Sequence, residues 1–294
     1  MWFLYSEYGA SFRSQIVNAF DPDTYKEDVV LEIAKLAPHE LTRLLRSDPP
    51  TETSHYLVST GPSPHDRTEP MSEVASPLLL ELYCTLRLND EAEELRKFYK
   101  MLHSDPTTTA VAGKVFEIQA HRFLRKGITL NLFRILSHRT SQGKNYIYDD
   151  YAATNNQVVS EQYTLPKLEE SIVTVETKTT DKFNTYCCHH SSNFPSIDSW
   201  VLVERSPKPP ILLAFQITVA RGSHDAKKVG LERLDKLAPA GIRKHLIVFT
   251  PEKATPQIFV TTDYLTTARL NGEDADTAFP VSHCPVVSDK VFVN

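Results

Sequence analysis

The sequence predicts an α/β protein in two parts, a mainly helical region over residues 1–107 and a mixed α/β domain over residues 108–294. Three observations support this prediction. Apolar residues recur at helical intervals through most of the first hundred residues. A long amphipathic helix follows, and after it come short, strongly apolar segments that are typical of strands. From Val111 the expected order is helix, strand, insertion, strand, strand, helix, strand, which is a mixed α/β layer.

The helical region is expected to contain two pairs of helices. Asp28–Leu45 carries apolar side chains at helical spacing, and Pro38 is expected to open the second helix of this pair. Ser76–Leu102 repeats the pattern, with Asn89-Asp90 marking the break. Pro49–Pro70 is rich in Pro, Ser, Thr and His, so we expect a loop with one short strand between the pairs.

The α/β domain begins with a helix predicted over Val111–Lys126, and Gly127 is its stop signal. Residues 128–136 are expected to form a strand, and residues 140–193 a polar insertion with strand-like pieces at Val158–Leu165 and Ile172–Thr177. Beyond the insertion we expect three strands and one helix, the strands at Ile197–Glu204, Ile211–Ala220 and His245–Thr250 and the helix from about His224 to Leu237.

Composition limits the function classes. With 41% hydrophobic and 23% charged residues in 294, the chain is typical of a globular protein rather than a fibrous or disordered one. Its longest apolar runs, such as Ile211–Phe215, fall far short of the roughly 18–20 residues that cross a bilayer, so no membrane partner is expected. The first residues lack a basic segment and reach Glu7 early, so no recognisable signal peptide is expected.

The net charge of −5 is unevenly distributed, which matters for a nucleic-acid partner. Residues 1–100 hold 10 Lys/Arg and 17 Asp/Glu, whereas residues 198–250 hold 9 and 5. The acid therefore belongs mainly to the helical region, and the segment with the most apolar strand is locally basic.

Several common motifs are absent from the sequence. It has no Walker A phosphate loop, no G-x-S-x-G elbow and no H-E-x-x-H zinc motif. Cys187-Cys188-His189-His190 contains zinc-type ligands, but four adjacent residues need a second, distant pair to close a site, and only His283-Cys284 offers one. The four cysteines have no disulfide-framework spacing, which favours a reducing compartment.

A stronger constellation joins Glu117 on the long helix, Asp198 at the start of a strand and Gln216 inside the most apolar strand. A polar Gln in such a strand costs desolvation unless it is bonded or liganded. Neighbouring strands lie about 5 Å apart, so they can bring Asp198 and Gln216 together. Two carboxylates, an amide oxygen and the carbonyl of Ile217 would form a hard oxygen site suited to Mg²⁺ or Mn²⁺.

These residues resemble the PD-(D/E)XK, or restriction-endonuclease-like, superfamily. The segments GKVFEIQAHRFLRKG, NFPSIDSW and FQITVARGSHDAKKVGLERL are similar to the nuclease-like domain of Crinkler effectors and retrotransposon-hot-spot-type proteins. HYLVSTGPSPHDRTEPMSEVASPLLLELY resembles the region before that domain in fungal members. The resemblance covers about residues 55–250 and implies an α-β-β-β-α-β core with a mixed sheet.

The resemblance also implies roles for individual residues. Glu117 and Asp198 would be metal ligands, and Gln216 would stand where the second motif acid usually lies. Thr218 occupies the usual lysine position, and it carries no positive charge. Three residues beyond it are candidates to take the place of that lysine at the strand end, namely His224, Lys227 and Lys228.

The function that follows is metal-dependent hydrolysis of DNA phosphodiesters by an effector- or mobile-element-associated protein. Phosphate contacts, independent of base sequence, would come from Arg221, Lys227, Lys228, Arg233, Lys236, Arg243 and Lys244. Because of Thr218, the alternative is a catalytically degenerate nuclease fold that binds DNA or protein. A protein partner is expected at the N-terminal helical region, and the resemblance implies the nucleus or cytoplasm, or secretion into a host.

Each of these residues also has a structural interpretation. Glu117 can pair along its helix with His121, Arg122 or Arg125. Asp198 can cap the turn before its strand, and Gln216 can be a satisfied core amide. His121 suits helix packing better than catalysis, and Lys227-Lys228 alone would form a solvated face.

Overall fold

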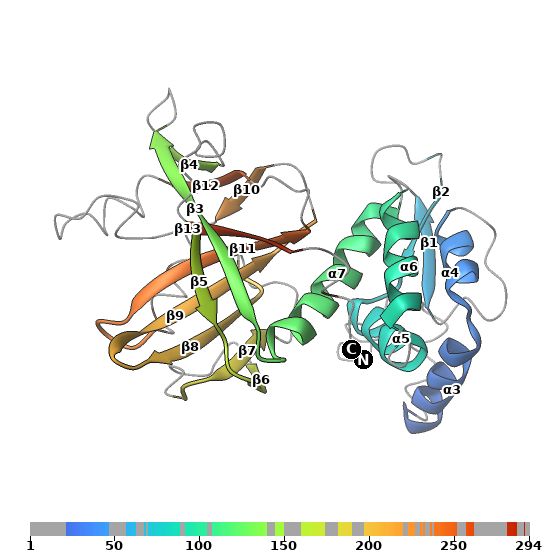
Figure 1. Ribbon diagram of the computed structural model, residues 1–294. Helices are drawn as coiled ribbons and strands as arrows, with labels where there is room; N and C mark the ends of the chain where they lie inside the picture. The colour runs from blue at the N-terminus through green and yellow to red at the C-terminus, as the bar shows by residue number, and fades with distance from the viewer. Residues whose placement is uncertain are drawn as a thin grey trace. The chain divides into compact units, whose positions relative to one another are not determined.

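The computed structural model describes residues 22–46, 57–62, 68, 70–88, 92–104, 108–139, 145–149, 160–173, 182–189, 197–219, 223–226, 230, 232, 236, 238–251, 257–261, 281–286 and 291. The chain divides into two compact units, one of Met1–Gln119 with Phe292–Asn294 and one of Ala120–Val291. This division falls inside one helix, whereas the sequence predicts a boundary at residues 107–108, which stays a prediction. The mixed α/β class is confirmed (Figure 1).

The first unit contains the two predicted helix pairs. They are α3 (Pro22–Lys35) with α4 (Pro38–Leu45), and α5 (Pro77–Leu88) with α6 (Ala92–His103). Pro38 is the first residue of α4, as predicted, and the Glu40 carboxylate accepts a 2.9 Å bond from the Ala37 backbone N–H. Residues of all four helices are fully buried, among them Val29, Leu41, Leu79 and Phe98. This unit therefore has a helical core of its own.

A short hairpin accompanies these helices, where the sequence predicts only one strand. Strand β1 (Val58–Pro62) pairs antiparallel with β2 (Pro70–Val74). Leu57 and Val58 are buried, whereas residues 60–62 are exposed, so β1 buries only its beginning. The second strand carries too little apolar character for its pattern to be read from the sequence.

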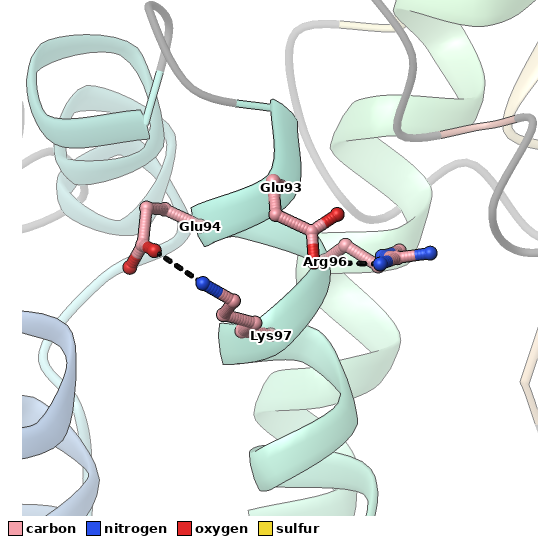
Figure 2. A network of polar contacts seen from close by, with 4 residues as sticks. All are labelled: Glu93, Glu94, Arg96 and Lys97. Atoms are coloured by element: carbon pink, nitrogen blue, oxygen red, sulfur yellow. Dashed lines mark hydrogen bonds and ion pairs between the residues drawn. The ribbon is translucent and has the colours of Figure 1, made fainter.

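The outer face of α6 carries a cluster of opposite charges (Figure 2). Glu93 pairs with Arg96 at 2.6 Å, and Glu94 pairs with Lys97 at 2.9 Å, each across three residues of the helix. Pairs at this spacing stabilise a helix by only about 0.2–0.5 kcal/mol. On the opposite face Leu95 is buried, so this cluster reflects the amphipathic character of α6 and not a binding site.

Helix α7 (Thr109–Leu124) is the long amphipathic helix that the sequence predicts. Its apolar face is buried at Ala112, Val115, Phe116, Ala120 and Leu124. The helix ends where Lys126 donates its backbone N–H to the Phe123 carbonyl and Gly127 takes a φ of 80°. Only glycine adopts that conformation without strain, so Gly127 is the predicted stop.

Replacing Gly127 by alanine is expected to destabilise the second unit more than the same change at Gly241. Both glycines have positive φ values, which cost a side chain about 1–2 kcal/mol. A Cβ at Gly127 would also lie 3.1 Å from the Lys167 backbone nitrogen, whereas one at Gly241 would meet nothing within 4 Å. Urea unfolding followed by Trp200 fluorescence measures the difference. If Gly127→Ala and Gly241→Ala lower the free energy of unfolding equally, the close approach to Lys167 does not contribute to the loss at Gly127.

The second unit is built on one mixed sheet. Among the described residues its strand order is β10-β12-β4-β3-β13-β11-β9-β8-β7-β6, with β5 pairing with β3. The strands are β3 (Thr129–Arg139), β4 (Asn145–Asp149), β5 (Ser160–Thr164), β6 (Glu169–Val173), β7 (Thr185–His189), β8 (Ser199–Arg205), β9 (Lys208–Ile217), β10 (Ser223–Ala226), β11 (Arg243–Pro251), β12 (Gln257–Thr261) and β13 (Val281–Val286).

The centre of this sheet holds the core. β7, β8 and β9 run antiparallel to one another in turn, and β11 lies beside β9 and parallel to it. All of Ile211–Phe215 in β9 and all of Leu246–Phe249 in β11 are buried. Because β9 and β11 are parallel, the chain between them must cross over the sheet.

The predicted helix over 224–237 is wrong at its beginning. Ser223–Ala226 form β10, which pairs in parallel with β12, and helical conformation is described only at Gly230, Glu232 and Lys236. The strands expected at residues 128–136, 197–204, 211–220 and 245–250 are confirmed as β3, β8, β9 and β11. In the insertion β5 and β6 overlap the predicted pieces, whereas β4 and β7 were not predicted. Strands β12 and β13, which follow β11 in the chain, were not predicted either. None of the described helices is long and apolar enough to span a membrane.

Candidate active site

Asp198 lies immediately before β8 and binds the neighbouring strand through both its backbone and its side chain. Its backbone N–H donates to the Phe215 carbonyl at 2.8 Å, and its Oδ2 accepts from the Ile217 backbone N–H at 2.6 Å. Asp198 therefore holds β9 on both sides of Gln216. These two bonds place Asp198 beside Gln216, whereas a shared metal site of the two residues stays a prediction.

The end of the β8–β9 ladder explains why an aspartate stands here. The β8–β9 ladder ends at Ser199, the first residue of β8, which pairs with Phe215. Beyond that pair the carboxylate of Asp198 supplies the acceptor for the Ile217 N–H, a local bond to which a short acidic side chain is suited. Asp198 thus has the capping role that the sequence left open. A carboxylate offers roughly four acceptor positions, so this bond does not exclude a metal ion.

Gln216 lies in the register between β8 and β11, where it faces Val248. Its side-chain Oε1 is buried and has no hydrogen-bond partner among the residues that the structure describes. Leaving such an atom unpaired costs about 1–3 kcal/mol. The described residues therefore do not support the alternative of a satisfied core amide at Oε1, and an amide oxygen of this kind is able to bind a hard cation.

Thr218 follows at the end of β9, where its backbone N–H donates to the Phe249 carbonyl at 3.0 Å. Its side chain is half-buried. No lysine is described at this point of the sheet, since Lys227 and Lys228 lie outside the described residues. Their predicted role stays a prediction.

Glu117 belongs to the first compact unit, whereas Asp198 and Gln216 belong to the second. On α7 its carboxylate pairs with the Lys114 Nζ at 2.7 Å. The sequence suggested His121, Arg122 or Arg125 as helix partners, and the observed ion pair is with none of these. Whether Glu117 converges with Asp198 and Gln216 stays a prediction.

His121, one helical turn after Glu117, begins a chain of hydrogen bonds that sequence reasoning missed. Its Nδ1 lies 2.7 Å from the Tyr186 hydroxyl, which in turn lies 2.6 Å from the Ser199 Oγ. Burial raises the pKa of Tyr186 well above its ordinary value, so this hydroxyl stays protonated. A sequence signal did exist, since Ser199 is a polar residue within an apolar strand.

Three members of the predicted DNA-contacting set are described, Lys236 in helical conformation and Arg243 and Lys244 at the start of β11. Arg243 and Lys236 are exposed, and Lys244 is half-buried. Arg243 faces Ile211 at the start of β11. Val248, which faces Gln216, lies about 16 Å further along the same strand, so Arg243 is distant from the proposed site. Arg221 and Arg233 lie outside the described residues.

His224 is the second residue of β10, not the start of a helix. Strand β10 pairs with β12 and is not a neighbour of β9 in the strand order. The predicted contact of His224 with phosphate or water stays a prediction. It was based on a helix that begins at His224, and the structure has a strand there.

The zinc-type ligands in the sequence are not brought together. Three strands, β8, β9 and β11, lie between β7, which carries Cys187 and Cys188, and β13, which carries Cys284. Burial also raises the pKa of the Cys284 thiol to about 12, which disfavours the thiolate that zinc needs. Among the described residues no group of three or more His, Cys, Asp or Glu side chains could hold a metal ion.

Comparisons with known proteins leave this site to be judged on its own geometry. No protein-family model, no curated protein and no solved structure matches the chain. The site consists of the Asp198 carboxylate just before β8 and, near the end of β9, the Gln216 amide oxygen, which has no hydrogen-bond partner in the described part of the chain. A hydrogen-bond chain from His121 through Tyr186 reaches Ser199, the residue after Asp198. Carboxylate and amide oxygens are the ligands that hard divalent cations prefer.

Proposed function

We propose that the second unit is a restriction-endonuclease-like domain that hydrolyses DNA phosphodiesters with Mg²⁺ or Mn²⁺. The observation that carries this proposal is the pairing of Asp198 with the residues on either side of Gln216, whose buried Oε1 has no partner in the described part of the chain. The arrangement of β7, β8, β9 and β11 after α7 supports an α-β-β-β-α-β core, because three antiparallel strands precede a parallel fourth.

The proposed ligands fit a hard cation. The Asp198 carboxylate and the Gln216 Oε1 would bind it, together with the Ile217 carbonyl and the Glu117 carboxylate. When bound, such an ion polarises the scissile phosphate and lowers the pKa of an attacking water. Gln216 is neutral, so of the two ligands at β8 and β9 only Asp198 would bring a negative charge to the ion.

A second function, DNA binding without cleavage, is favoured by Thr218. A threonine hydroxyl carries no positive charge and is a poor base, so it cannot replace the lysine that orients water in related nucleases. Lys227 or Lys228 would have to take that role. The 9 Lys/Arg against 5 Asp/Glu in residues 198–250 suit a DNA backbone in either case.

Plasmid cleavage in Mg²⁺, Mn²⁺ or EDTA tests this proposal. We expect cleavage only with a metal, and a rate about tenfold lower in Glu117→Ala. The effect is moderate because Lys114 already neutralises part of the Glu117 charge. Glu94→Ala is the matched control, since Glu94 forms the same kind of ion pair with Lys97 on another helix.

The outcomes separate the two functions. Cleavage that is equal in wild type and Glu117→Ala would remove Glu117 from the site. No cleavage, together with salt-sensitive retention of DNA in a gel shift, would favour the binding module. If neither is seen, DNA is not the partner, and a protein that binds the N-terminal helices becomes the leading candidate. In a cell we propose action in the nucleus or cytoplasm, including that of a host, which microscopy of a tagged protein tests.

A further inference from the structure

A hydrogen-bond chain joins the half-buried His121 to Tyr186 and Ser199, and Ser199 is the residue that follows Asp198. Tyr186 and Ser199 have no exposed surface, and the two hydrogen bonds measure 2.7 and 2.6 Å. Three elements meet in it, since His121 comes from the last part of α7, Tyr186 from β7 and Ser199 from β8. A satisfied network of this kind gives a single geometry to the elements that it joins.

The position of the Tyr186 ring is fixed independently of its hydroxyl. Tyr186 faces Val201 across the β7–β8 ladder, and Ser199 lies two residues before Val201, so both side chains lie on the same face of the sheet. The Phe215 ring lies 6.3 Å from the Tyr186 ring, and the His121 imidazole meets it edge-on at 5.8 Å. The hydroxyl is therefore held where packing places it.

The hydroxyl of Tyr186 has one hydrogen and two partners. It donates to one of them and accepts from the other, so His121 and Ser199 have complementary roles in the chain. Removing the hydroxyl takes this bond from both partners, and the loss falls mainly on Ser199, which has no exposed surface.

Ser199 follows Asp198 in the chain, is the first residue of β8 and pairs with Phe215 of β9. The Phe215 carbonyl also accepts the N–H of Asp198, and the next bond along is that from Ile217 to the Asp198 carboxylate. Fixing the Ser199 side chain thus fixes the backbone from which the carboxylate projects. We propose that Tyr186 is a positioning residue for Asp198 and acts through Ser199, with His121 holding the other side of its hydroxyl.

This inference rests on the proposed metal site for its functional meaning, but its geometric part can be measured without metal. Tyr186→Phe removes the hydroxyl and keeps the ring. The matched control is Tyr163→Phe in the same unit, which removes a hydroxyl that accepts a 3.3 Å, partly buried bond from Arg205. Ser199→Ala breaks the chain from its other end and serves if Tyr186→Phe does not fold.

The first readout is hydrogen exchange of the Ile217 amide by NMR in the metal-free protein, since that N–H donates to Asp198. We expect exchange about fivefold to tenfold faster in Tyr186→Phe and Ser199→Ala, and unchanged in Tyr163→Phe. The Thr218 amide, which donates to Phe249, is the internal reference. Equal acceleration of Ile217 and Thr218 would show a merely structural role, and an unchanged Ile217 amide would show that Tyr186 does not position Asp198. Either result would overturn the inference.

The second readout is the Kd for Mn²⁺, measured by the EPR signal of free Mn²⁺. We expect about tenfold weaker binding in Tyr186→Phe and Ser199→Ala, with Tyr163→Phe equal to wild type. Equal Kd values in all four proteins would overturn the link between Tyr186 and the metal site while leaving that site standing. If wild type itself binds no Mn²⁺, the proposed function fails, and the Ile217 amide in the same samples still decides whether Tyr186 positions Asp198.

Discussion

Asp198→Asn is expected to lower the rate of Mn²⁺-dependent DNA cleavage at least about 100-fold while leaving the protein nearly as stable as wild type. The substitution keeps the shape of the side chain and keeps an amide oxygen that can accept the Ile217 N–H, which Asp198 Oδ2 accepts at 2.6 Å. It removes the negative charge. Because Gln216 is neutral, no other proposed ligand on β8 or β9 supplies that charge to a divalent ion.

Asp198→Ala separates the capping role from the chemical role. It removes both the charge and the acceptor, so we expect the same loss of cleavage together with a fall of roughly 1–2 kcal/mol in the free energy of unfolding. Glu204→Gln is the charge-matched control, since Glu204 is an exposed carboxylate near the other end of β8. Plasmid cleavage and urea unfolding measured on the same preparations give both quantities. Full activity in Asp198→Asn would show that Asp198 only caps β9.

The elements that the sequence predicted well are those whose signals are local. The helices of the first unit follow from apolar periodicity, and Pro38 and Gly127 mark a start and a stop that depend only on backbone conformation. Strand β9 was clear because Ile211–Phe215 is a continuous apolar run, which a strand in the centre of a sheet requires.

The errors lie where pairing is distant in the sequence. Ser223–Ala226 was expected to open a helix, but it pairs with Gln257–Thr261, a partner that no local pattern reveals. Strand β7 was hidden in the same way, because its apolar character is confined to Tyr186 and the two cysteines.

In the candidate site, too, local features were predictable from the sequence and contacts between distant segments were not. Asp198 and Gln216 were predictable together because β8 and β9 are consecutive strands joined by a short turn, so their pairing is the simplest arrangement. The chain from His121 through Tyr186 to Ser199 was not predictable, because it requires both the pairing of β7 with β8 and the placement of α7 against β7.

Phe215→Ala is expected to be the most destabilising single substitution considered for the second unit, at about 3–5 kcal/mol. Phe215 has no exposed surface and lies in β9 between Ser199 of β8 and Ile247 of β11, so the sheet cannot close over the space that its ring leaves. Phe183→Ala makes the same chemical change at a side chain that is 45% exposed, and we expect a loss below about 1 kcal/mol there.

Guanidinium unfolding followed by Trp200 fluorescence, in a background where Trp2 is replaced by phenylalanine, reports on the second unit in which Trp200 is buried. Similar losses for Phe215→Ala and Phe183→Ala would contradict the burial on which the prediction depends. The bond from the Asp198 N–H goes to the Phe215 backbone carbonyl, which alanine retains. Well below the unfolding transition, Phe215→Ala should therefore bind Mn²⁺ far better than Asp198→Asn. The cavity weakens the core, but Asp198 keeps its backbone bond to residue 215 and its carboxylate keeps the bond from the Ile217 N–H.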